Sequence, residues 1–348
     1  MATTTRYRMP AEWEPHEGTW LAWPHERTDW PGKFEPIPWV YCDIVRRLSR
    51  VERVHILIND PDSAELARVM LEDAGANLAA VDFFECPTDR SWTRDFCPIW
   101  VRDEAGRPVI LNWGFNGWAK YDNWQVDDAV PSAVAARLGT PEVQPVFRGR
   151  RVVLEGGSID VNGLGTILTT EECLLSDVQS RNPGLTREDL EDVFAQYLGI
   201  RHTLWLRNGI YGDDTHGHVD DLARFTDPRT VVIASEADPA SPNYEPLLEN
   251  ISLLREMRDQ DGEPLRVVPL PMPAPVEFAG QPLPASYANF YIANKMVLVP
   301  TFNDPRDRVA LNTLAELFPD REVTGIHCLD LVLGLGTLHC MTQQQIAC

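Results

Sequence analysis

The chain has 348 residues, of which 44% are hydrophobic and 24% charged, a composition typical of a folded protein with a large apolar core. Thirty-one Lys and Arg against 52 Asp and Glu give a net charge of −21, which argues against nucleic acid as a partner because phosphate binding depends on basic side chains. The same acidity is compatible with attracting a small cationic substrate.

The seven cysteines are scattered along the chain and form no C-x-x-C pair. The first residues carry no apolar segment of the kind found in secretion signals, and no apolar run is long enough to span a membrane. Free thiols without a targeting segment predict a soluble, cytoplasmic protein in a reducing compartment.

Short apolar segments alternate with amphipathic ones from one end of the chain to the other. The apolar segments predict buried strands at 54–58, 108–113, 229–235 and 295–302. The amphipathic segments predict helices at 62–75, 185–199 and 304–319. No low-complexity linker interrupts this alternation, so we expect one α/β domain over residues 1–348.

Several predicted helix ends carry their own signals. Gly75 and Gly199 stand where two of the helices end, and Thr186 is a suitable N-cap for the second. The helix at 304–319 has a proline in its first turn and stops at another. The proline-rich segment 267–286 is predicted to be a long loop of the kind that often lines a site.

Four stretches concentrate reactive or conformationally special residues. They are "DRSWTRDFCPIW" (89–100), "LEGGS" (154–158), "DDTHGHVDDLARF" (213–225) and "LHC" (338–340). In the third, His216, His218 and Asp220 alternate and would offer three metal ligands if they lay on one strand face. A solvated acidic loop with a capping side chain is the structural alternative for the same stretch.

A third interpretation joins all four stretches. A thiolate nucleophile requires a nearby acid or base, and a planar guanidinium is best held by carboxylates that accept its N–H groups in pairs. The chain offers Cys340, His218, Asp95, Asp220 and Glu155, which together supply these groups. The residues alone do not establish that they converge in space.

Six motifs in register resemble the agmatine deiminase family, which includes the bacterial-type peptidyl-arginine deiminases. They lie at 9–25, 91–101, 154–175, 213–225, 285–294 and 338–345, so the resemblance covers nearly the whole chain. It implies the pentein fold, an α/β-propeller of five ββαβ-type units around a pseudo-fivefold axis, with the site at its centre. It implies neither a metal nor a cofactor.

The resemblance also implies a role for each catalytic residue. Cys340 would attack the guanidinium carbon, and His218 would protonate the leaving ammonia and then activate water. Asp95 and Asp220 would bind the guanidinium nitrogens, and Glu155 would keep the His218 imidazole cationic. Because carboxylates disfavour a thiolate, we expect Cys340 to ionise only when the cationic substrate is bound.

Further residues are expected at the substrate without a catalytic role. These are Trp92, Arg94, Gly156, Gly157, Asp214, Leu335 and Gly336. His216 is expected to be structural, and His339 to position the backbone beside the thiol. The tail of agmatine carries a primary ammonium, for which Asp213, Asp214 and residues 114–124 are the candidate partners.

The chain departs from the family pattern at two places. Leu335 interrupts a run that is usually three glycines, and Phe96 and Cys97 replace a usual small residue and glycine. Leu335 and Phe96 are therefore expected to narrow or redirect the pocket around the substrate tail. Agmatine is the favoured substrate, in a reaction that gives N-carbamoylputrescine for putrescine biosynthesis, with a homo-oligomer possible. Deimination of free or peptidyl arginine, amidino transfer, and a non-catalytic binding module remain alternatives.

Overall fold

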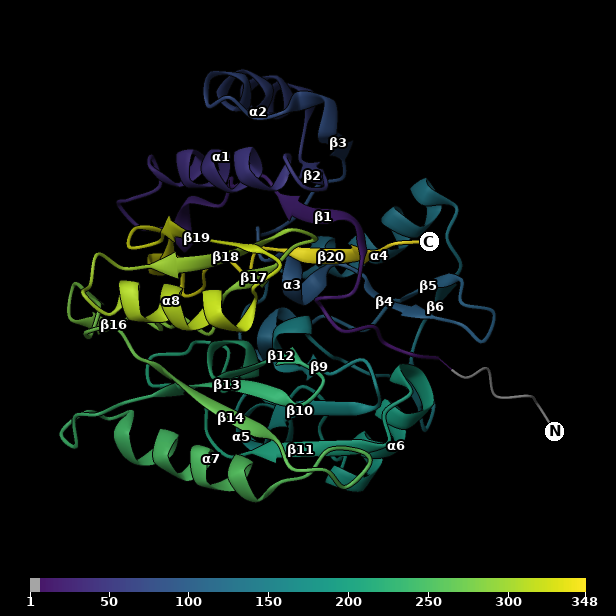
Figure 1. The fold of residues 1–348 in the computed structure, drawn as a ribbon. Coiled ribbons are helices and arrows are strands. Elements are labelled where there is room, and N and C mark those ends of the chain that lie inside the picture. Colours follow the sequence, from purple (N-terminus) through teal and green to yellow (C-terminus); the bar gives the residue numbers. More distant parts are fainter. Residues whose placement is uncertain (1–6) are drawn as a thin grey trace.

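A computed structural model describes residues 7–348 of the chain. Within these residues, five of the sheets repeat one pattern of strands (Figure 1). In each, a central strand pairs antiparallel with one neighbour and parallel with the other. A helical connection joins each parallel pair, because the chain must return to the same end of the sheet before the next strand can begin.

Four of these β-β-α-β units follow one another along the chain. The first has β4 (Ile99–Arg102), β5 (Pro108–Leu111), α4 (Gln125–Leu138) and β6 (Glu142–Val143). The second has β9 (Asp160–Val161), β10 (Thr166–Thr170), α5 (Glu171–Leu175), α6 (Arg187–Leu198) and β11 (His202–Leu206). The third has β12 (Ala223–Asp227), β13 (Thr230–Ser235), α7 (Tyr244–Glu256) and β14 (Arg266–Pro271). The fourth has β17 (Tyr291–Ile292), β18 (Met296–Thr301), α8 (Asp307–Leu317) and β19 (Glu322–His327).

The fifth unit is assembled from both ends of the chain. Its N-terminal part comprises β1 (His16–Ala22), α1 (Ile37–Leu48) and β2 (Arg53–Ile58), extended by α2 (Pro61–Asp73) and β3 (Val81–Glu85). Its antiparallel strand is β20 (Gln343–Ile346), which pairs with β1. Figure 1 shows this strand in yellow beside the purple β1. Strand β20 thus completes this fifth unit.

A buried segment precedes the antiparallel strand of every unit. Before β4 this segment contains α3 (Thr93–Phe96), before β9 the 3₁₀ helix η4 (Gly156–Ser158), and before β12 the 3₁₀ helix η5 (Val219–Asp221). Residues 285–290 and 336–342 occupy the corresponding places before β17 and β20. Since α3 contacts η4 and η4 contacts η5, these segments meet in the interior of the molecule.

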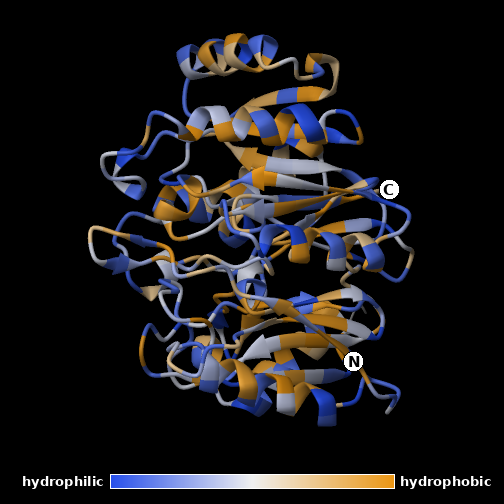
Figure 2. Ribbon diagram, turned by 60° about the vertical axis from the view of Figure 1, so that its left-hand side comes forward, coloured by the Kyte–Doolittle hydropathy of each residue, from blue (hydrophilic) through white to orange (hydrophobic). Residues whose placement is uncertain are grey.

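Apolar strands form the core of the units and helices cover them. Figure 2 shows orange strands inside and helices of mixed blue and orange at the periphery, as expected for helices that bury one face. In β18, for example, Met296 to Pro300 are all buried. Among residues 7–348, no helix combines the length and apolar character that crossing a membrane requires.

The predicted strands at 54–58, 229–235 and 295–302 are confirmed as β2, β13 and β18. The strand at 108–113 is confirmed as β5 but ends at Leu111. Helices 62–75 and 185–199 are confirmed as α2 and α6. Thr186 caps α6 in a reciprocal capping box with Asp189, and Gly199 ends it in the left-handed conformation.

Two expectations about proline-rich segments were wrong. The segment 267–286 is not one long loop, because β14 occupies its first residues and a hairpin of β15 (Glu277–Phe278) and β16 (Gln281–Pro282) follows. Pro269 and Pro271 are tolerated because β14 is an edge strand of its sheet. Helix α8 begins at Asp307, so Pro305 lies ahead of the helix and not in its first turn.

Two helix-ending glycines form a matched pair for testing the packing of the N-terminal segment. Gly139 and Gly199 both have positive φ, but a Cβ on Gly139 meets open space whereas one on Gly199 would overlap the carbonyl oxygen of Tyr7. We expect Gly139→Ala to lower the free energy of unfolding by about 1 kcal/mol and Gly199→Ala by about 3 kcal/mol or more. Urea unfolding measures both, and equal losses would contradict the close contact.

Candidate active site

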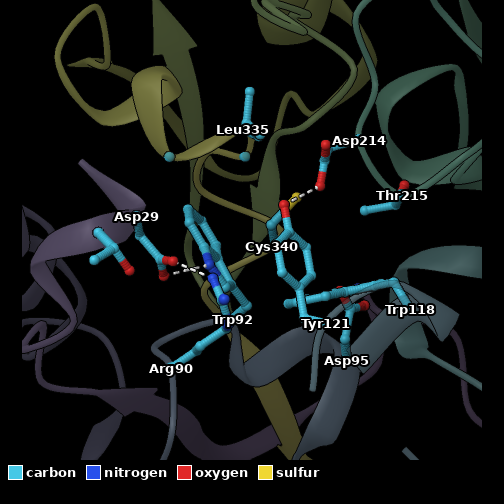
Figure 3. A pocket seen from close by; sticks show the side chains of 13 residues that line it. Asp29, Arg90, Trp92, Asp95, Trp118, Tyr121, Asp214, Thr215, Leu335 and Cys340 are labelled. Carbon is cyan, nitrogen blue, oxygen red and sulfur yellow. Dashed lines mark hydrogen bonds and ion pairs between the residues drawn. The ribbon is translucent and has the colours of Figure 1, made fainter. Parts of the chain in front are cut away.

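A cavity of about 250 Å³ opens at the centre of the molecule, and Cys340 lines it (Figure 3). Its other lining residues come from segments far apart in the sequence. They are Thr28, Asp29, Arg90, Trp92, Asp95, Trp118, Tyr121, Asp214, Thr215, Gly334, Leu335 and Gly336. Trp92, Asp95, Asp214, Leu335, Gly336 and Cys340 were expected at the site from the sequence, and the structure brings these six together.

Cys340 is presented by the tight segment that precedes β20. A Cβ on Gly336 would lie 3.2 Å from the Cys340 sulfur, so only glycine leaves this side of the thiol open. The Cys340 carbonyl accepts a hydrogen bond from the backbone N–H of Arg94 at 3.1 Å. These contacts fix the backbone beneath a thiol that is 6% exposed.

His218 lies between carboxylates that come from three segments. Its Nδ1 atom is 3.9 Å from Asp95 Oδ1 and 3.9 Å from Asp220 Oδ1, and its Nε2 atom is 3.9 Å from Glu155 Oε2. A Cβ on Gly157 would lie 2.5 Å from the His218 ring, so glycine is required for this approach. Because Gly156 and Gly157 have no side chains, Arg94 and His218 can approach their backbone closely. Both glycines were expected at the substrate from the sequence, but neither lines the cavity.

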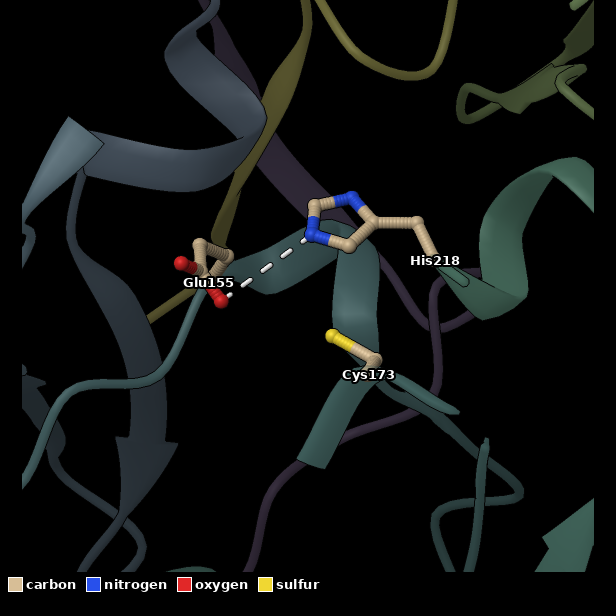
Figure 4. A group of neighbouring side chains, drawn as sticks. All are labelled: Glu155, Cys173 and His218. Carbon is tan, nitrogen blue, oxygen red and sulfur yellow. Dashed lines mark ion pairs between the residues drawn. The ribbon is translucent and has the colours of Figure 1, made fainter. Parts of the chain in front are cut away.

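A second thiol, that of Cys173, lies close to His218 and Glu155 (Figure 4). Side-chain atoms of Glu155, Cys173 and His218 lie within 4.8 Å of one another, and all three residues are buried. Arg181 donates to Glu155 Oε1 at 3.0 Å and to the backbone carbonyls of Gln179 and Thr215. The guanidinium of Arg181 therefore neutralises one carboxylate oxygen and leaves the other facing His218.

The electrostatics of the centre favour an imidazolium and disfavour a thiolate. Burial opposes a positive charge on His218, but Asp95, Cys173 and Asp220 together raise its pKa well above the ordinary value. Burial is the main factor that raises the pKa of Cys340 well above its usual range, and the carboxylates of Asp220, Asp221 and Asp95 add to it. Both pKa shifts agree with a Cys340 that stays a neutral thiol until a cation binds beside it.

The two guanidinium-binding candidates differ in their surroundings. Burial raises the pKa of Asp95 to about 6, although the carboxylate accepts hydrogen bonds from Trp118 Nε1 at 2.8 Å and from the Gly157 N–H at 3.0 Å. Burial acts the same way on Asp220, but a 2.7 Å contact with His339 Nδ1 lowers its pKa below the ordinary value. Asp220 Oδ2 is also 3.7 Å from the Cys340 sulfur.

Several buried polar atoms around this centre have no hydrogen-bond partner among the described residues. They are both ring nitrogens of His218, Glu155 Oε2, Asp220 Oδ1 and Asp221 Oδ1. Unpaired buried polar atoms are costly and rare in folded proteins, so their clustering indicates a place prepared for a polar, positively charged group.

A charged network behind the site supports the reacting residues. His339 lies between Asp220 and Glu12, with its Nε2 atom 2.8 Å from Glu12 Oε2. Arg94 donates to Glu12 at 3.1 Å, to the His339 carbonyl and to Gln344, and it does not line the cavity. The expectation that Arg94 contacts substrate was therefore wrong, because each of its three guanidinium nitrogens donates to Glu12 or to the terminal segment.

The metal interpretation of His216, His218 and Asp220 does not match the geometry. These residues lie in a turn and in η5 rather than on a strand. The ring of His216 contacts Ser176 Oγ at 3.2 Å, away from the other two, which agrees with its expected structural role. Asp213 accepts the N–H groups of Thr215, Gly217 and His218, so it shapes this turn.

Charged pairs surround the outer part of the cavity. Asp214 accepts hydrogen bonds from Lys120 Nζ at 2.5 Å and from the Tyr121 hydroxyl at 2.7 Å. Asp29 is paired with Arg90 and accepts the Trp92 indole N–H at 3.0 Å (Figure 3). The carboxylates of Asp214 and Asp29 on the cavity wall are therefore partly neutralised by Lys120 and Arg90.

The two departures from the family pattern have different outcomes. Leu335 adopts the left-handed conformation, with φ of 68°, which the usual glycine would adopt at lower cost, and its side chain lines the cavity. Phe96 is buried against Phe115, with ring centroids 6.1 Å apart, and does not line the cavity. The expectation for Phe96 was therefore wrong, and Leu335 is the departure that shapes the pocket.

Sequence reasoning assigned no role to several site residues. Trp118 and Tyr121 lie in the 114–124 stretch, which the sequence proposed only as a general partner for the substrate tail. Asp29, Arg90 and Arg181 were assigned no role, since their partners are remote in the sequence: Asp29 pairs with Arg90, and Arg181 pairs with Glu155. Asn289 lies within the motif at 285–294, and its amide contacts the Cys340 sulfur.

Comparisons with known proteins agree with this architecture. A family profile described as Porphyromonas-type peptidyl-arginine deiminase matches residues 8–345. An agmatine deiminase of Pseudomonas aeruginosa is 36% identical over 98% of this chain and 96% of its own length. Two solved structures are also similar over nearly their full length. The agmatine deiminase of Enterococcus faecalis has a TM-score of 0.89 at 30% identity, covering 99% of this chain and 98% of that one. An agmatine deiminase variant of C. jejuni with substrate bound has a TM-score of 0.88 at 28% identity, covering 100% and 98%.

The five ββαβ-type units and this structural similarity define the class of protein as a pentein, the α/β-propeller expected from the sequence. The chain belongs to the family of agmatine deiminases and bacterial-type peptidyl-arginine deiminases, which confirms the resemblance of its motifs. The sequence match extends across all five units, from residue 8 to residue 345.

The pKa of Asp95 predicts how activity depends on pH. Because burial raises this pKa to about 6, Asp95 becomes neutral below that pH and loses its attraction for a guanidinium. We expect kcat/KM to fall by about tenfold per unit below pH 6. Asp29 also lines the cavity with a pKa raised to about 6, so Asp29→Asn is the control. A pH profile that loses this acid limb in Asp29→Asn would contradict the assignment to Asp95.

Proposed function

We propose that this protein hydrolyses agmatine to N-carbamoylputrescine and ammonia. The observation that carries the proposal is the set of unpartnered, buried oxygen and nitrogen atoms of Asp220, Glu155 and His218 beside the Cys340 thiol. A planar guanidinium supplies N–H donors and a positive charge to the carboxylate oxygens of this set, whereas the His218 imidazolium is itself a donor. The agmatine deiminases from Pseudomonas aeruginosa and Enterococcus faecalis support the choice of substrate.

In the first half-reaction, the guanidinium lies between Asp95 and Asp220 with its carbon facing the Cys340 sulfur. Its charge favours ionisation of the Cys340 thiol, whose proton is released to solvent, whereas the carboxylates of the empty site disfavour the thiolate. The sulfur attacks the carbon and forms a neutral tetrahedral adduct. His218 donates a proton to one nitrogen, the C–N bond breaks, ammonia leaves, and a cationic thiouronium on Cys340 remains.

In the second half-reaction, His218 is neutral and accepts a proton from water as the oxygen attacks the same carbon. The C–S bond of the resulting adduct breaks and returns its electron pair to sulfur. The protonated ureido product passes its extra proton to the Cys340 thiolate and departs, which restores the thiol. Glu155 holds His218 through both steps, and Arg181 fixes Glu155 from behind.

The outer cavity would receive the aminobutyl tail of agmatine. We assign its wall to Trp92, Tyr121 and Leu335, and the partner of the terminal ammonium to Asp214. Asp213 is no longer a candidate, because its carboxylate is used by backbone N–H groups. The ammonium would bind Asp214 together with Lys120, or would take the place of Lys120 at Asp214.

Citrulline-forming deimination is the second candidate, because the family profile that matches this chain is named for peptidyl-arginine deiminases. It would use the same reacting residues and differ only at the tail. Amidino transfer to an amine is less well supported because the similar proteins named above are deiminases. A non-catalytic binding role is less well supported because Cys340 and Asp95 line the cavity while His218, Asp220 and Glu155 lie buried beside them. We also propose that the five units form a single domain, because β1 of the N-terminal part pairs with β20 at the other end of the ring.

Ammonia release from agmatine, free arginine and a peptide ending in arginine tests the proposal directly. We expect turnover of agmatine, and a loss of at least 1,000-fold in Cys340→Ser because serine is a much weaker nucleophile. Cys348→Ser is the control, since this exposed thiol lies outside the cavity. Turnover of arginine or the peptide alone would reassign the substrate, and no turnover of any of the three would overturn the proposal.

Asp214→Asn tests the position of the ammonium. The amide keeps the shape of the side chain and an oxygen for Tyr121 or Lys120, but removes the negative charge. We expect KM for agmatine to rise by about tenfold with kcat little changed, because the contact is remote from the reacting carbon. Steady-state kinetics measures both values. An unchanged KM would move the ammonium partner to Asp29 on the other side of the cavity.

A further inference from the structure

The five units suggest that a fifth segment also supplies the centre. The segments before β4, β9, β12 and β20 deliver Asp95, Glu155, Asp220 and Cys340 respectively. The segment before β17 is buried in the same way and delivers Asn289, which is 0% exposed. None of the steps proposed above uses this residue.

The amide of Asn289 has a fixed orientation. Its Oδ1 atom accepts hydrogen bonds from Thr337 Oγ1 at 2.7 Å, from the His339 N–H at 3.0 Å and from the Cys340 N–H at 3.4 Å. Because three donors converge on this oxygen, the NH₂ group must point the other way. It donates to the Cys340 sulfur at 3.1 Å.

Most of the charges that face this sulfur are negative. Asp220, Asp221 and Asp95 raise the pKa of Cys340, and Asp220 Oδ2 lies 3.7 Å from the sulfur. His218 is the nearby cation, held among carboxylates from three segments. The remaining titratable groups on the cavity wall are Asp29, Arg90, Tyr121 and Asp214. A donor from a neutral side chain therefore stabilises the sulfur anion without attracting these carboxylates to itself.

We propose that Asn289 is a catalytic residue whose amide N–H binds the Cys340 thiolate and aims it at the guanidinium carbon. The proposal rests on Cys340 as the nucleophile of the proposed function. Before attack, the donor stabilises the anion that the carboxylates oppose. When the C–S bond breaks in the second half-reaction, the same donor receives the returning anion. Through Oδ1, the residue also holds the turn that carries the thiol.

Asn289→Asp separates donation from support of the turn. It keeps the oxygen that accepts from Thr337, His339 and Cys340, but places an oxygen where the NH₂ group faced the sulfur. We expect kcat for agmatine to fall about 100-fold, the scale of losing one aimed donor, with KM changed less than about threefold. Thr337→Val is the matched control, since it removes one hydrogen bond to Oδ1 and leaves the donor. We expect it to lower kcat by less than about fivefold.

Alkylation of Cys340 provides a readout that does not depend on turnover. Chloroacetamidine, a small cationic amidine, is followed by mass spectrometry of the Cys340 peptide from pH 6 to pH 10. We expect the alkylation rate of Asn289→Asp at pH 8 to fall at least about tenfold, because the thiolate has lost its donor. For the same reason, we expect the midpoint of the curve of alkylation rate against pH to move up by about one pH unit. Thr337→Val should keep the wild-type midpoint.

An Asn289→Asp protein that is alkylated at the wild-type rate at every pH would overturn the proposal, as would turnover within about threefold of wild type. A Thr337→Val protein that matches the losses of Asn289→Asp would also overturn it, since support of the turn would then explain both. If the wild-type protein turns over no guanidine, but Asn289→Asp still slows alkylation, the proposed function fails while the thiolate donor stands. Thermal unfolding checks each variant, and Asn289→Ser replaces Asn289→Asp if the latter does not fold.

Discussion

The buried carboxylate of Glu12 is the constraint on which the rest of the centre depends. It accepts hydrogen bonds from Arg94, Arg224 and the backbone N–H of Ile292, and it contacts His339. Burial opposes this charge, but Arg224, His339 and Arg94 hold the pKa of Glu12 well below its ordinary value. One side chain near the start of the chain thus ties together segments from the other units, and through His339 it orients Asp220 toward the thiol.

The centre is unbalanced in charge until a cation enters it. Asp95, Glu155, Asp220 and Asp221 converge there, against the imidazole of His218 and the guanidinium of Arg181. Burial and mutual repulsion raise the pKa of Asp221 well above its ordinary value, which relieves part of the excess. The negative charge that remains favours a guanidinium over the ureido group of the product, because the ureido group is neutral and cannot compensate it.

Helix ends could be predicted from the sequence, because they depend on one or two neighbouring residues. Thr186 and Gly199 bound α6 as expected, since capping and left-handed termination depend on single residues. The roles of Arg94 and Phe96 could not be read from their motif, because a side chain's direction there depends on Glu12 and Phe115, which are remote in the sequence. The motifs located Cys340, His218 and Asp95, but their distances, and the contact of Asn289 with sulfur, follow only from how five units close into a ring.

That closure has a consequence for biosynthesis. Cys340 and β20 leave the ribosome after the other four units, and β20 pairs with β1, which left it before them. A nascent chain can fold its middle units while it is still being made, but it has no Cys340 thiol to place at the centre until residue 340 has been added. With Cys340 as the proposed nucleophile, a polypeptide that stops before residue 340 would lack the reacting thiol while keeping four units whole.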